Sequence, residues 1–319
     1  MAGANLPGGK LAAWKWPALA ALLAALCALP FLLSNFSIFQ LTLVTAYAVV
    51  LLGLNMLTGY NGQISLGHGA FYAVGAYVAA ILMDHYGAPY WTTLPVAAVA
   101  CLAAGFLFGL PSLRLEGPYL ALATFALAVS VPLLALKWSK FLGGRDGVQT
   151  SETVSNLWLY GAAWIASAIL FVLAWLILRG RIGRAFRAVR DSEIAAVASG
   201  IELPVYKTLA FGISAAYAGV AGSLFVLANN GFAAPDEFGI FLSLQILIGA
   251  AVAGLGSLWG ILAGAAFVGL LPSVSSSVPV IGSSHGRDVV FGAAAILVML
   301  ILPGGFAGLL AQLRRVVRA

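Results

Sequence analysis

The amino-acid sequence predicts an all-α polytopic membrane protein with about ten transmembrane helices. Hydrophobic residues make up 62% of its 319 residues and charged residues only 8%, whereas a soluble globular chain carries about 25% charged residues. The mean hydropathy is +1.03, and unbroken apolar runs such as residues 41–57 have the length of a membrane-spanning helix. These observations exclude a water-soluble enzyme, a disordered chain and an outer-membrane β-barrel.

The apolar runs divide the chain into spans, each of which needs about 20 residues to cross the hydrocarbon core. The expected spans are residues 17–33, 39–57, 64–83, 91–112, 119–136, 157–178, 208–228, 240–253, 258–271 and 289–302. The eighth and ninth are short and glycine-rich, so they also fit one re-entrant hairpin, and the count is then eight to ten. We expect one transmembrane domain over residues 1–319.

Two short segments share the pattern Gly-x-x-Ser-Leu, at residues 62–66 and 254–258. Each precedes an apolar run rich in small residues. Transporters are often built from repeated halves that meet at the substrate path. The pattern therefore favours repeated halves, with chance similarity as the alternative.

The basic residues predict the orientation in the membrane. The chain carries 16 Lys and Arg against 10 Asp and Glu, a net charge of +6, and the basic residues gather at residues 10–15, 179–190 and 314–318. With ten spans these three clusters lie on one side, which the positive-inside rule assigns to the cytoplasm, together with both termini. The exception is the segment with Lys137, Lys140 and Arg145, which falls on the other side.

Several classes of site find no support in the sequence. No polar domain is present to bind nucleic acid, and Cys27 and Cys101 fall inside apolar runs, so we expect neither a disulfide framework nor a metal site. No cleavage site follows the first apolar run cleanly, so we expect it to be retained. Catalytic motifs and a phosphate-binding loop are also absent, so we expect no cofactor and no enzymatic activity. Few charges lie inside spans, which argues against ion-coupled transport.

The first candidate functional segment is residues 55–72, where glycines and neutral polar side chains interrupt two apolar runs. Backbone that leaves helical geometry at membrane depth must be buried in protein or line a wet cavity. We therefore predict that this break lines a translocation path, through Asn55, Thr58, Gln63, Ser65, His68 and Tyr72. The alternative, compatible role is close helix packing at structural glycines, which are Gly59, Gly62, Gly67 and Gly69, with Gly254 and Gly256 in the later break.

His68 stands at the start of an apolar run and has two interpretations of its own. It could contact solute or carry a proton, or it could be an interhelical hydrogen-bonding group whose partners are satisfied. A metal-binding role is disfavoured because no second ligand stands at a suitable spacing.

The second candidate segment is the basic loop, residues 179–207. Asp191 can cap a short helix over residues 192–199, and Glu193 in its first turn suits the positive end of the helix. Ile194, Val197, Ala198 and Ile201 form one apolar face, and Gly200 and Pro204 end the helix. We expect this face to contact lipid, the protein's own spans or another protein, whereas simple membrane anchoring accounts only for the arginines. A third segment, residues 141–149, is predicted to form an ordered turn or a docking surface.

The break and the basic loop together resemble the permease of bacterial branched-chain amino acid ABC importers, in particular the longer of the two paired permeases. The resemblance rests on residues 55–77, 117–124, 143–147, 188–200 and 253–260, which occur in family order. It covers about residues 41–302. The chain departs from the family at Ala253, usually glycine, and at Ile261, usually proline, both in the late glycine-rich turn.

The resemblance implies a transport subunit of the bacterial inner membrane that works with partner chains. These are two ATP-binding subunits, a second permease (a sister chain or a second copy) and a periplasmic solute-binding protein, with lipid around the spans. Residues 179–207 then form the ATPase-coupling loop, through Arg190, Asp191, Glu193, Ile194, Ala195, Ala196 and Gly200. The implied function is ATP-driven alternating access for branched-chain amino acids or a similar small polar solute. The alternatives are a permease for urea, amides or aromatic acids, and a self-contained channel or secondary transporter.

Overall fold

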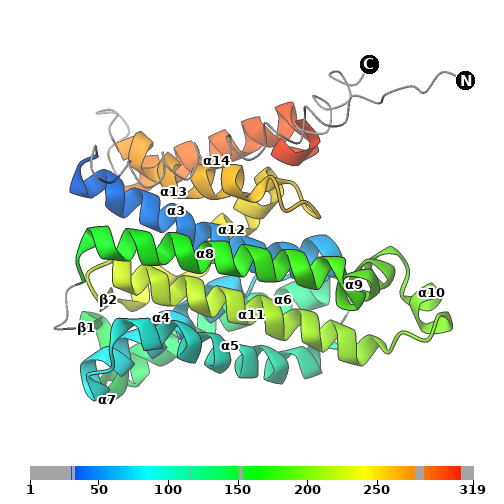
Figure 1. Ribbon diagram of the computed structural model, residues 1–319, viewed down its shortest axis with the longest axis horizontal. Helices are drawn as coiled ribbons and strands as arrows, with labels where there is room; N and C mark the ends of the chain where they lie inside the picture. The colour runs from blue at the N-terminus through cyan, green and yellow to red at the C-terminus, as the bar shows by residue number, and fades with distance from the viewer. Residues whose placement is uncertain (1–29, 31–32, 116, 151–153, 277–283, 310–319) are drawn as a thin grey trace, which may run out of the picture.

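A bundle of long helices forms the protein (Figure 1). The computed structural model describes residue 30 and residues 33–115, 117–150, 154–276 and 284–309, with the side chains of 275–288 left out. The main helices are α3 (Asn35–Leu54), α4 (His68–Tyr86), α5 (Tyr90–Ser112), α6 (Pro118–Lys137), α8 (Asn156–Arg179), α9 (Arg181–Asp191), α10 (Glu193–Ala198), α11 (Leu203–Ala228), α12 (Ile240–Ala253), α13 (Ile261–Ser276) and α14 (Ser284–Ile301). The expected first span, residues 17–33, and the terminal basic clusters lie outside the described residues.

The all-α membrane fold is confirmed. Within the described ranges, six helical segments are long and apolar enough to cross a membrane: Asn35–Tyr60, Tyr90–Ser112, Pro118–Lys137, Asn156–Arg179, Leu203–Ala228 and Val289–Leu309. They match six of the expected spans. The helix expected over residues 64–83 is wrong at its start, because α4 begins at His68 and residues 62–67 are not helical. Gly62 has a φ of +85°, in the left-handed region that favours glycine, and so ends the preceding helical segment.

The two late helices are shorter than a full span. α12 has 14 residues and α13 has 16, which correspond to roughly 21 and 24 Å, against a hydrocarbon core of about 30 Å. They pack against each other and are joined by residues 254–260. This geometry fits the re-entrant hairpin as well as two short spans, so the range of eight to ten is retained.

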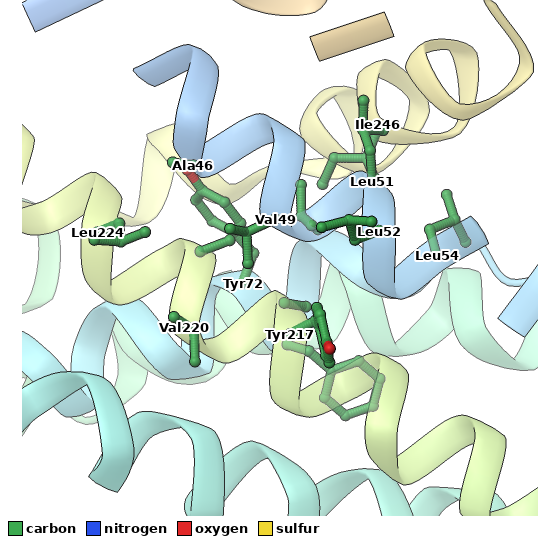
Figure 2. Packing of buried hydrophobic residues seen from close by; sticks show 14 of the residues in the cluster. Ala46, Val49, Leu51, Leu52, Leu54, Tyr72, Tyr217, Val220, Leu224 and Ile246 are labelled. Atoms are coloured by element: carbon green, nitrogen blue, oxygen red, sulfur yellow. The ribbon is translucent and has the colours of Figure 1, made fainter. Parts of the chain in front are cut away.

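The core lies where α3, α4 and α11 meet. Buried side chains of these helices and α12 form one cluster, part of which is visible in Figure 2. Glycines let the backbones approach: a Cβ at Gly75 of α4 would overlap the carbonyl of Gly219 of α11, and one at Gly222 would overlap the carbonyl of Tyr72. Small residues at helix contacts are typical of membrane bundles.

The two ends of the bundle differ. At one end lie α9 and α10, and at the other lies a two-residue antiparallel ladder of β1 (Val148–Gln149) with β2 (Phe232–Ala233) (Figure 1). The ladder was not predicted, because two-residue strands leave no periodic pattern. The short helices α7 (Ser139–Leu142) and η2 (Gly144–Asp146) precede β1 and confirm the expected ordered turn around residues 141–149.

Candidate functional site

The break between α3 and α4 begins as a π-helix, η1 (Asn55–Tyr60). Such wide turns are rare and are frequent at functional sites. After η1 the chain is held by side chains and backbone together: the Thr58 hydroxyl donates to the Gln63 carbonyl at 2.9 Å, and Gln63 N–H donates to the Leu57 carbonyl at 3.2 Å. The Gln63 side chain donates to Asn61 Oδ1 at 2.6 Å and to the Lys207 carbonyl at 3.1 Å. The break is therefore an ordered structure and is joined to α11.

The early and late breaks touch each other through Asn55. Its Nδ2 donates to the Ser257 carbonyl at 2.7 Å, and its Oδ1 accepts from the Gly256 N–H at 2.7 Å. A Cβ on Gly59 would also overlap the backbone nitrogen of Gly256. The two Gly-x-x-Ser-Leu segments thus belong to breaks at the same end of the bundle, although the repeat itself stays a prediction.

His68 lies in a chain of neutral hydrogen bonds and is 1% exposed. The Ser214 hydroxyl donates to the Gly53 carbonyl at 2.7 Å and contacts His68 Nε2. Because that hydroxyl proton is used, Nε2 carries the proton that Ser214 accepts, and Nδ1 accepts from the Ser65 hydroxyl at 3.2 Å. Both ring nitrogens are occupied, which favours the hydrogen-bonding interpretation, while a contact with solute stays a prediction.

Two glycines of the break pack tightly, as the packing alternative requires. A Cβ on Gly67 would lie 2.9 Å from the Thr124 carbonyl of α6, and one on Gly69 would overlap the Ser243 hydroxyl of α12. Ser243 also accepts from the Gly69 N–H at 3.0 Å. These contacts favour the close-packing role at the two positions, and they do not exclude a path beside them.

The basic loop contains the predicted short helix, α10, with one correction at its start. Ser192 caps α10, with its side chain accepting from the Ala195 N–H at 3.3 Å, whereas Asp191 is the last residue of α9 and pairs with Arg190 at 3.0 Å. Ser192 can act as the N-cap because its backbone is extended, as a cap requires, with φ −165° and ψ 115°. Gly200, with φ +81°, follows the helix as predicted.

The apolar side of α10 is partly buried against the protein and partly exposed. Ile194 is 86% exposed and Val197 is also exposed, whereas Ala196 is buried. Among the predicted coupling residues, Ile194 and Ala195 are therefore available to a partner and Ala196 is not. Glu193 is tied back to the bundle by an ion pair with Lys207 at 2.6 Å.

Arg190 joins the two candidate segments. Its Nη1 donates to the Gly59 carbonyl, within the π-helix, at 2.8 Å. A cavity of about 170 Å³ lies between the break and the loop and is lined by Asn61, Gln63, Arg190, Glu193 and Lys207 among others. Contacts between residues over 100 positions apart leave no local pattern in a sequence, so the break and the loop were predicted as separate sites.

A second cavity, of about 290 Å³, lies on the other side of the break, between α3, α4, α11 and the start of α12. It is lined by Tyr47, Tyr72, Phe225, Asp236, Glu237 and Leu242 among others. Tyr72 is the one predicted path residue that lines it. The acidic pair belongs to the short helix η3 (Pro235–Phe238), and the sequence analysis missed it because both residues follow an apparent span end.

Glu237 is half-buried and held in place. Its carboxylate accepts from Asn229 Nδ2 at 3.0 Å and from the Ala234 N–H at 3.3 Å. Burial raises the pKa of this carboxyl above its usual range, and the two hydrogen bonds partly oppose that shift. A carboxylate in such surroundings is stabilised by a cation that enters the cavity.

Comparisons with known proteins agree on one family. A family described as "Branched-chain amino acid transport system / permease component" matches residues 36–303. The high-affinity branched-chain amino acid transport system permease protein LivM of Escherichia coli is 35% identical over 275 residues, covering 76% of this chain and 64% of its own length. The corresponding permease protein LivH of Salmonella typhimurium is 25% identical over 292 residues, covering 84% and 92%. The chain thus spans slightly less than two thirds of LivM, and no solved structure matches it.

Proposed function

The chain belongs to the permease-component family of branched-chain amino acid transport systems, and from this premise we propose that it is the transmembrane permease subunit of a bacterial inner-membrane ABC importer. Residues 1–319 act as one domain that moves branched-chain amino acids or a similar small polar solute by alternating access. ATP hydrolysis takes place in partner chains. Both termini and the loop of residues 179–207 face the cytoplasm.

The observation that carries this proposal is the exposed apolar side of α10. Ile194 and Val197 project from a short capped helix at the end of the bundle. Apolar side chains gain about 25 cal/mol for each Å² that a partner removes from water. An ATP-binding subunit that receives this helix in a groove explains why the loop is ordered and yet leaves these side chains uncovered.

Arg190 connects the docked helix to the membrane-spanning part of the chain. Its side chain connects α9 to the Gly59 carbonyl, and Asn55 connects the same π-helix to Gly256. A displacement of α9 and α10 would therefore act on both breaks together. In this proposal Thr58, Gln63 and Ser65 lie at the inner part of the path, Tyr72 lies at the outer cavity, and His68 acts by holding α4 to α11.

The partners follow from the family. They are two ATP-binding subunits at α10, a second permease subunit, either a sister chain or a second copy, and a periplasmic solute-binding protein at the end with β1 and β2. Lipid covers the remaining apolar faces. The competing functions are a permease of the same type for urea, amides or aromatic acids, and a channel or secondary transporter that needs no ATPase.

Reconstitution with candidate ATP-binding subunits, the sister permease and the binding protein tests the proposal. We expect ATP-dependent leucine accumulation in proteoliposomes, and no uphill accumulation by the permease alone. Ile194→Asp should lower co-purification of the ATPase and leucine uptake at least tenfold. The control Leu110→Asp, at an exposed apolar side chain of α5 outside that loop, should leave co-purification of the ATPase unchanged. Uphill accumulation by the chain alone, or full coupling in Ile194→Asp, would contradict the proposal.

A further inference from the structure

The outer cavity combines two oppositely charged features with an apolar wall. One side carries the carboxylates of Asp236 and Glu237, and another is formed by the start of α12, where Gly239 and Leu242 line the space. Within the described structure no side chain caps this helix N-terminus. The N-terminus of a helix favours an anion, because its first N–H groups have no intrahelical partner. The cavity therefore offers separate places for a cation and for an anion.

An orphaned hydroxyl indicates that the cavity is built to receive a ligand. Tyr72 is 1% exposed, and its Oη has no hydrogen-bond partner among the residues that the structure describes. The side chain lines the cavity together with Tyr47 and Glu237. A buried hydroxyl without a partner is destabilising, so a ligand atom that pairs with it is stabilised there. Figure 2 shows this ring among the buried side chains of the core.

The size and the apolar wall restrict the ligand further. A cavity of about 150 Å³ is enough for benzene, so 290 Å³ holds a small aliphatic amino acid. The rings of Phe225 and Phe241 and the side chain of Leu242 supply the apolar part of the lining. These side chains offer an apolar surface to the aliphatic group of a ligand.

We propose that this cavity binds the zwitterionic head of an α-amino acid, with the ammonium group at Asp236 and Glu237, the carboxylate at the start of α12, and the Tyr72 hydroxyl between them. The inference rests on the proposed transport function and deepens it by assigning a solute-binding site to residues of this chain. Urea and amides carry neither charge, and aromatic acids lack the ammonium group, so the site selects against these alternatives. The permease itself then contributes to solute choice.

Binding to the purified full-length chain in lipid nanodiscs tests the site, with leucine and two analogues as probes. 4-Methylpentanoate lacks the ammonium group, and 3-methylbutylamine lacks the carboxylate. We expect saturable leucine binding that is at least tenfold tighter than binding of either analogue. Binding of leucine no tighter than its analogues, or no saturable binding of leucine, would overturn the proposal.

Point variants test which side chains bind the ligand. Glu237→Gln should weaken leucine binding at least tenfold and remove the preference for leucine over 4-methylpentanoate, while Glu237→Asp should restore most of that preference. Tyr72→Phe should weaken binding severalfold. Glu202→Gln, which removes an exposed carboxylate before α11, is the matched control and should bind as wild type. A Glu237→Gln variant that elutes as a monodisperse protein and keeps the preference would contradict the assignment.

Uptake by the complete importer separates this inference from the function on which it rests. If wild type accumulates leucine and Glu237→Gln raises the KM for leucine, the transport function and the solute site are both supported. If wild type accumulates leucine and Glu237→Gln has an unchanged KM, the site is wrong and the transport function stands. If the complete importer accumulates no leucine, the proposed function fails, whatever the nanodisc measurements give.

Discussion

Helices α11 and α8 are both apolar enough to span a membrane and have opposite surroundings. Their most apolar windows have mean hydropathies of 1.7 and 2.3, yet 78% of the α11 window is buried inside the protein and only 17% of the α8 window. In a bilayer both surroundings are apolar, so both helices qualify as spans, and the less apolar of the two is the one at the centre of the bundle. What distinguishes α11 is its small and hydroxyl-bearing residues, such as Ser214, Gly219 and Gly222.

The largest difference between the two helices is expected from glycine replacement. Gly219→Leu on α11 should destabilise the fold by about 3 kcal/mol or more, because its Cβ would lie 2.5 Å from Cys101 Sγ and 2.8 Å from the Ala97 carbonyl. Gly161→Leu on α8 should be neutral, since no atom of the described residues lies within 4 Å of a Cβ there. Denaturation midpoints in detergent and yields of monodisperse protein measure both. Equal midpoints for the two variants would remove the contrast between centre and rim.

Replacement of serines should give a smaller difference. Ser214→Val leaves the Gly53 carbonyl and His68 Nε2 without their partner, and we expect a loss of about 1–2 kcal/mol. Ser167→Val on α8 removes only a 3.5 Å bond to the Thr45 carbonyl and should change stability by less than about 0.5 kcal/mol. The same denaturation measurement applies. If Ser167→Val is the more harmful change, the hydrogen-bond chain through His68 does not hold α4 to α11.

The smallest effect is expected on the outer face of α8. Ile169 is 55% exposed, so its side chain contacts mainly detergent. The stability of Ile169→Ala should therefore stay within about 0.5 kcal/mol of wild type. Leu224→Ala on α11, at a fully buried side chain, should lower the free energy of unfolding by about 2 kcal/mol or more. Thermal midpoints in detergent decide between them. A marked loss for Ile169→Ala would show that this face is covered by protein, as in a self-associated permease.

Much of the fold could be predicted from the sequence, because length and hydropathy are local properties. The bounds of α12 agree with the expected residues 240–253, and Gly200 ends α10 as expected. The start of α4 could not be predicted, since Ile64 and Leu66 fit the first turn of the span as well as the polar break before it. Their departure from helix depends on contacts with α6 and α11, such as the bond from the Leu66 N–H to Thr124 Oγ1 at 2.9 Å.

The candidate site was predicted in its parts and not in its connections. Polar residues in an apolar run marked the break, and a capped helix among arginines marked the loop. The contacts of Arg190 with Gly59 and of Asn55 with Gly256 join segments distant in the chain, and one sequence contains no signal for such pairs. The acidic cavity was missed for a related reason, because its lining comes from four helices and η3.

The carboxamide of Asn55 also has a consequence for mutational tolerance. It presents a donor to the Ser257 carbonyl and an acceptor to the Gly256 N–H at once, so aspartate could satisfy only the second of these and leucine neither. Glutamine has the same pair of groups but is longer by one methylene in a fully packed place. In a library with all twenty amino acids at this position, a growth selection that depends on solute uptake should return asparagine almost alone.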